Sequence, residues 1–121
     1  MKTNKFITQG LRKAVSDEYA MAEKYYSILS VVNDLHMTQR EVQLVAFTAV
    51  KGNMSYAYIR EEFCQKHDTT PPTINNIISR LKKIGVLIKE KGKVKVNPDI
   101  LLNFNGSAVG LKILLTTASN G

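Results

Sequence analysis

The feature that most restricts the fold is a change in hydrophobic spacing at Gly85. Before this glycine, apolar residues recur at every third or fourth position, which is the spacing of one helix face, and predict a helix over 71–84. After it, apolar residues alternate with lysines in two short runs, 86–90 and 93–96, on either side of a Lys-Gly tip. A glycine at such a tip is typical of a tight hairpin, so a helix followed at once by a two-stranded hairpin is predicted.

Capping residues indicate where the other helices begin and end. Thr38 and Glu41 have the spacing of a capping box, in which each side chain binds the backbone amide of the other residue. Ser55 and Thr70 are expected to cap the two helices that follow. The helices expected before 71–84 are therefore 17–34, a central one that runs from the capping box to Gly52-Asn53, and 56–67.

A second hairpin is expected after Asn97-Pro98. The runs 100–104 and 109–116 are apolar, and Asn105-Gly106 between them favours a tight turn. The expected organisation is a basic tail over 1–15, a packing or dimerisation helix within 16–36, a central unit over 37–97 and a C-terminal β-hairpin over 98–121.

Positive charge is concentrated in two parts of the chain. The net charge is +7; residues 1–15 carry four basic residues and no acid, and residues 69–97 carry seven basic residues against one acid. Segregation of this kind favours a polyanionic partner, either a nucleic acid or an acidic protein surface.

Several classes of protein are disfavoured. The one cysteine, Cys64, allows no internal disulfide, and no stretch reaches the length of about 18 apolar residues that a membrane helix needs. We therefore expect a cytoplasmic protein (in the host cytoplasm or the virion if phage-encoded) with no membrane contact. His36 and His67 are isolated, and there is no Gly-rich phosphate loop. No enzymatic activity, cofactor, metal site or small-molecule substrate is expected.

The stretch 73–89, TINNIISRLKKIGVLIK, resembles the recognition helix and first wing strand of MarR-type regulators and of small phage or plasmid regulatory and replication proteins. Residues 38–97 are similar to a winged helix-turn-helix domain. The resemblance implies a mainly α fold with small β: a three-helix core plus a β-hairpin wing, here with an extra N-terminal helix and a C-terminal β-hairpin. It also implies that the helix over 71–84 enters the major groove of DNA and that the wing follows the backbone or minor groove.

The residue types on this predicted unit suit that role. Short polar side chains can form hydrogen bonds with base edges, and lysines can form ion pairs with phosphates. The N-terminal end of the helix, with its free backbone amides, can also lie against a phosphate. Lysines on a hairpin are equally compatible with a solvated edge that resists aggregation. Tyr25, Tyr26, Tyr56 and Tyr58 are interpreted as core and helix-packing residues rather than stacking platforms. The candidate DNA-binding residues are Thr70, Pro72, Thr73, Asn75, Asn76, Ser79, Arg80, Lys83, Lys89, Lys91, Lys93 and Lys95.

Two functions fit these observations. The first is a winged-helix protein that binds double-stranded DNA, a transcription or replication regulator of the phage or plasmid type, acting as a homodimer through the helix over 17–34. The alternative is a non-enzymatic structural or adaptor component of a larger assembly, such as a phage virion or a transcription complex. There the winged helix would make protein–protein contacts, since fold does not fix function.

Overall fold

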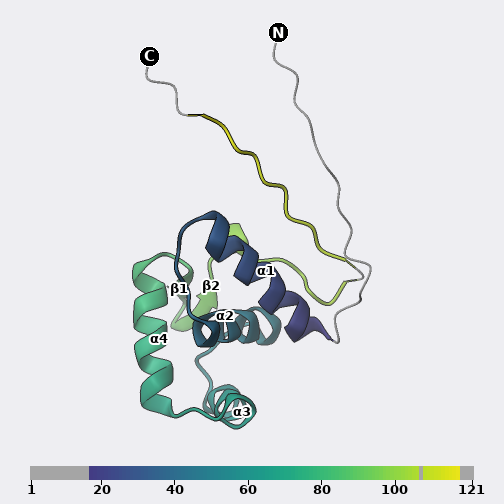
Figure 1. Cartoon of the computed structure of the whole chain (residues 1–121). Coiled ribbons are helices and arrows are strands. Elements are labelled where there is room, and N and C mark those ends of the chain that lie inside the picture. Colours follow the sequence, from purple (N-terminus) through teal and green to yellow (C-terminus); the bar gives the residue numbers. More distant parts are fainter. Residues whose placement is uncertain (1–16, 107, 118–121) are drawn as a thin grey trace.

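The computed structural model describes residues 17–106 and 108–117, so the basic tail over 1–15 lies outside the described residues. This part of the chain is mainly helical with one small antiparallel hairpin, which confirms the predicted order of helices and hairpin (Figure 1). No helix in it is both long and apolar enough to cross a bilayer. The elements are α1 (Glu18–Val32), α2 (Gln39–Lys51), α3 (Ala57–His67), α4 (Pro71–Lys83), β1 (Leu87–Glu90), β2 (Lys93–Val96) and the 3-10 helix η1 (Pro98–Ile100).

The helix α2 is the centre of the core. Side chains on most of its circumference are buried, including Leu44, Val45 and Phe47. Helix α1 packs against it and buries Ala22 and Tyr26 (Figure 1). Each large apolar side chain buried in this way contributes about 1.5–3 kcal/mol, which is why a helix that is apolar nearly all round is stable only in the interior.

The start of α2 is fixed as the sequence predicted. Thr38 Oγ1 accepts from the amide of Glu41 at 3.2 Å, and Glu41 Oε1 accepts from the amide of Thr38 at 2.8 Å. The helix ends at Gly52, whose φ of 98° lies in the left-handed region that favours glycine.

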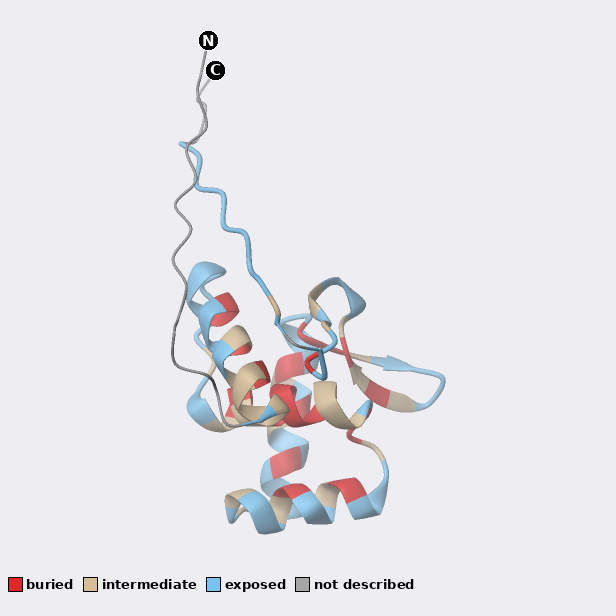
Figure 2. Ribbon diagram, turned by 90° about the vertical axis from the view of Figure 1, so that its right-hand side faces the viewer, coloured by how far each residue is buried: buried red, intermediate tan, exposed pale blue. Residues whose placement is uncertain are grey.

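The hairpin has one face on the core and an exposed tip. Glu90 pairs with Lys93, so the turn consists of Lys91 and Gly92, whose φ angles of 51° and 79° are both positive, as a type I′ turn requires. Val94 and Val96 are buried, and Lys93 and Lys95, which alternate with them, point to the other side of the strand. Lys89 pairs with Val94 and lies toward the exposed end of the core face. Figure 2 shows the exposed tip of the hairpin projecting from the helices.

A short extended segment before α3 lies beside β2. The amide of Met54 donates to the carbonyl oxygen of Val94 at 2.9 Å, and the amide of Val94 donates to Ser55 Oγ at 2.8 Å. The expectation that Ser55 caps α3 is therefore wrong: Tyr56 occupies the cap position without a side-chain bond. The hydroxyl of Ser55 instead supplies the acceptor that β2 needs on its open edge.

The predicted C-terminal hairpin over 98–121 is also wrong for the residues that the structure describes. After β2 they contain η1 but no strand, and residues 110–117 are exposed and run away from the helices (Figure 1). The preceding residues are held against α1 instead: Tyr26 Oη donates to the carbonyl oxygen of Ile100 at 2.9 Å, and Phe104 is buried against Tyr25 and Tyr26. Consecutive leucines without alternation give the segment no single face to bury as a strand.

Candidate nucleic-acid interface

Helix α4 divides into a buried and a polar face. Ile74, Ile78 and Leu81 are buried, as the spacing predicted. Ile84, expected to continue this stripe, is exposed because the helix ends at Lys83. The other face presents Pro72, Thr73, Asn75, Asn76, Ser79 and Lys83, all exposed.

The first turn of α4 differs in one detail from the prediction. Thr70 occupies the cap position, but its side chain makes no capping bond; its Oγ1 instead lies 3.1 Å from Thr73 Oγ1. Pro71 opens the helix, where its missing N–H costs nothing. Both threonine hydroxyls are exposed at the end of the helix where the backbone amides point outward.

The hairpin lysines fall into two pairs. Lys89 and Lys91 are exposed, whereas Lys93 and Lys95 are half-buried. Lys95 Nζ lies 3.6 Å from Glu90 Oε1, and Lys93 Nζ lies 5.0 Å from the ring centroid of Tyr56. The free charge of the hairpin is therefore concentrated at Lys89 and Lys91, with Lys93 held toward α3.

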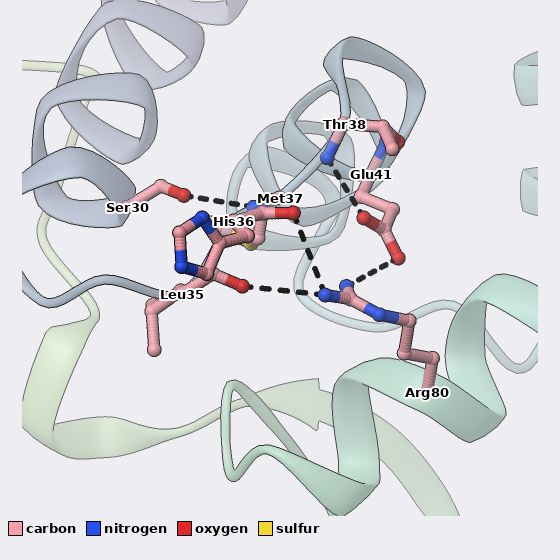
Figure 3. A network of polar contacts seen from close by, with 7 residues as sticks. All are labelled: Ser30, Leu35, His36, Met37, Thr38, Glu41 and Arg80. Atoms are coloured by element: carbon pink, nitrogen blue, oxygen red, sulfur yellow. Dashed lines mark hydrogen bonds and ion pairs between the residues drawn. The ribbon is translucent and has the colours of Figure 1, made fainter.

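Arg80 belongs to an internal network and not to the outer face of α4 (Figure 3). Its guanidinium lies 2.6 Å from Glu41 Oε2 and donates to the carbonyl oxygen of Leu35 at 3.2 Å. The Glu41 side chain is only 6% exposed, so its charge needs this partner. The same carboxylate closes the capping box with Thr38. Arg80 therefore lies outside the candidate interface. The sequence did contain a signal for this internal ion pair, since Glu41 is the capping-box glutamate of a helix expected to be buried.

Arg60, in the first turn of α3, joins α4 to the segment that precedes α3. Its Nε donates to the carbonyl oxygen of Met54 at 2.9 Å, and its other nitrogen donates to Asn75 Oδ1 at 2.7 Å. The carboxamide of Asn75 is thereby oriented with its NH2 group left to donate. Asn76, the next residue, is exposed.

Sequence reasoning missed an exposed aromatic pair. Tyr25 and Tyr26 do pack in the core region, as interpreted. Tyr56 and Tyr58, however, are 42% and 66% exposed, and their rings stack with centroids 5.8 Å apart and planes 12° apart. Their positions outside the buried stripe of α3, which contains Ile59 and Phe63, were the available signal.

The far end of α3 is fixed by His67. Its ring centroid lies 4.7 Å from that of Phe63, and its carbonyl oxygen accepts from Arg40. Burial lowers the pKa of His67, and the positive charges of Lys66 and Arg40 lower it further. This histidine is therefore a packing residue of the α2–α3 contact.

The described residues hold no group of three or more His, Cys, Asp or Glu placed to bind a metal ion. A hollow of about 200 Å³ lies between the end of α2 and the hairpin, beside Ala49 and Val96. This volume is below the range of about 300–1,000 Å³ that is usual for small-molecule sites.

Comparisons of the chain with protein-family models, curated proteins and solved structures find no match. Function is therefore inferred from the geometry of the chain itself.

Proposed function

We propose that the chain is a winged-helix protein that binds double-stranded DNA, with α4 in the major groove and the hairpin β1–β2 along the backbone. The observation that carries this proposal is that one end of α3 contacts both the lysine hairpin and the exposed polar face of α4. The start of α3 connects the two: Tyr56 contacts Lys93 of the hairpin, and Arg60 binds Asn75 of α4. Lysines beside a polar helix face are suited to bind one duplex together.

The side chains divide by task. Thr73, Asn76 and Ser79 are exposed and short enough to reach base edges, and a carboxamide can pair with adenine through two hydrogen bonds. Lys83, Lys89 and Lys91 are exposed charges suited to phosphates. The resemblance of 73–89 to MarR-type and small phage or plasmid proteins supports a role in transcription or replication control in the cytoplasm.

Fluorescence anisotropy of the purified protein with random-sequence duplex DNA, at several salt concentrations, tests the proposal. If these three lysines each neutralise one phosphate, log K should fall with log salt at a slope of about −2.7. Absence of binding at low salt would contradict the proposal.

A specific observation favours protein contact as a second candidate function. Helix α1 and the segment 108–117 expose large apolar side chains, among them Val31 at 77% and Leu115 at 87%. Surfaces of this kind serve homodimers and larger assemblies. Sedimentation over a range of protein concentrations distinguishes a monomer from a dimer, and Val31→Ser should weaken a dimer that forms through α1.

A further inference from the structure

Tyr56 and Tyr58 expose aromatic ring surface that is not buried in the core. Tyr58 is among the more exposed aromatic side chains described, and the two rings are nearly parallel, 12° apart. Their mutual stacking holds both rings in a fixed orientation at the first turn of α3. A rigid, exposed ring pair costs little conformational entropy on binding, because few rotamers remain to be ordered.

The charge beside these rings is positive. Lys93 Nζ lies 5.0 Å from the ring centroid of Tyr56, within the distance of a cation–π contact. The Arg60 guanidinium lies one turn further along α3. Of the two carboxylates one turn beyond Tyr58, Glu62 is paired with Lys51 at 2.6 Å and Glu61 is exposed, so the positive charge lies on the Tyr56 side of the ring pair. An aromatic surface with a cation at its edge suits a planar ring joined to an anion.

The ring pair also lies at a junction within the proposed interface. The hairpin reaches it through Lys93, and α4 reaches the same turn of α3 through the bond between Arg60 and Asn75. A DNA strand whose phosphate is bound by Lys93 would therefore pass beside Tyr56, on whose ring Tyr58 stacks.

We propose that Tyr56, Tyr58 and Lys93 form a stacking site for one unpaired base, so that the preferred ligand is duplex DNA with a single-stranded extension. The inference rests on the proposed function, since the hairpin lysines hold the backbone. The base stacks on the exposed ring of Tyr58, and Lys93 faces its phosphate. Stacking of this kind accepts any base, because every base has a π face.

The test compares duplexes that differ only in the bases of their extension. One carries a short extension with bases, including a 2-aminopurine, and the other an extension of equal length made of abasic sites, which keeps the phosphates. One stacked base should tighten binding by about 5- to 100-fold, and 2-aminopurine fluorescence should fall as it stacks. Emission is read without tryptophan background, because the chain has no Trp.

Two variants at one exposed position separate the ring from the fold. Tyr58→Leu removes the ring and should abolish the preference for the base-containing extension while leaving affinity for blunt duplex unchanged. Tyr58→Phe keeps the ring and should keep the preference.

Each outcome distinguishes the two proposals. Equal affinity for both extensions, with blunt duplex still bound, overturns the stacking site and leaves the proposed function standing. Binding of the duplex with the base-containing extension, lost in Tyr58→Leu, without any binding of blunt duplex overturns the proposed function and supports the stacking site. Failure to bind any of these DNAs overturns both.

Discussion

Helical spacing places Arg80 among the polar residues of α4, yet its side chain turns back to Glu41. The reason is the burial of Glu41, whose carboxylate closes the capping box of the central helix. A long side chain is drawn to a poorly solvated opposite charge, and helical spacing alone does not show that partner. The exposed positions of Thr73, Asn76 and Ser79 could be predicted from helical spacing, because their exposure depends only on the formation of α4.

The variant Arg80→Met should lower the free energy of unfolding by about 1–3 kcal/mol, because it leaves a buried carboxylate without its partner. This loss of stability is smaller than that expected for a fully buried ion pair, because the Arg80 side chain is 42% exposed and solvent screens its charge. Urea denaturation followed by circular dichroism measures it. Lys82→Met, at an exposed position on the same helix, is the matched control and should change stability by less than about 0.5 kcal/mol. Equal effects of the two variants would show that the network does not stabilise the fold.

His67 should make the fold sensitive to mild acid. Its pKa in the folded protein is lowered by burial from the ordinary value of 6.5. Below that pH the unfolded chain takes up the proton first, so stability is fully present above about pH 6.5 and is lost as the pH falls toward the folded-state pKa. Denaturation midpoints between pH 7.5 and 5 should therefore fall less for His67→Asn than for the unchanged chain. A slope that is the same in His67→Asn and in the unchanged chain would refute the assignment.

The elements α1 to α4 and the hairpin were predictable because their signals are local. A capping box, a proline at the first helical position and a Lys-Gly turn each act within a few residues. The hydrogen bond of Ser55 depends on Val94, which is distant in the sequence. The position of the chain after β2 depends in the same way on Tyr26 of α1, which binds Ile100. A strand forms only beside a pairing partner, and the spacing of residues in the sequence does not identify that partner. The prediction of a second hairpin was wrong for this reason.

The contact of Ser55 with β2 should support the hairpin. Ser55→Ala removes the acceptor of the Val94 amide and should cost about 1–2 kcal/mol, because the amide of this buried residue then lacks a partner. Hydrogen exchange of the Val94 amide, followed by NMR, should accelerate more than that of amides in α1. Ser79→Ala, at an exposed position of α4, is the control. Unchanged protection of Val94 would mean that the β-ladder alone holds β2 in place.

The exposed lysines of the hairpin should set the salt dependence of DNA binding. Lys89→Ala combined with Lys91→Ala should weaken binding to all duplexes alike and reduce the slope of log K against log salt by about 1.8, or 0.9 for each lost phosphate contact. Lys24→Ala, an exposed charge on α1, should leave the slope nearly unchanged. Anisotropy titrations at several salt concentrations measure both, and an unchanged slope in the double variant would exclude the hairpin from backbone contact.

Across the whole molecule, the core is completed by residues far apart in the sequence. Phe104 is buried, with its ring centroid 5.6 Å from that of Tyr26 on α1, and so holds the chain after β2 against the first helix. Beyond Val109, which is half-buried against the same core, every described side chain is exposed. The cooperative unit of folding therefore extends from α1 to about Val109, and it includes residues that the sequence assigned to a separate extension.

Two changes near the C-terminal end test this boundary. Deletion of residues 111–117 and those that follow them should change the free energy of unfolding by less than about 0.5 kcal/mol, because the side chains of 111–117 are exposed and exposed side chains contribute little to stability. Phe104→Ala should cost about 3–5 kcal/mol, since it opens a cavity between the tyrosines of α1, and this is a large fraction of the roughly 5–15 kcal/mol that stabilises a domain. Both are measured by urea denaturation. A deletion as costly as the Phe104 variant would mean that the exposed leucines are covered in solution, as in a dimer, and the midpoint of the intact chain would then rise with protein concentration.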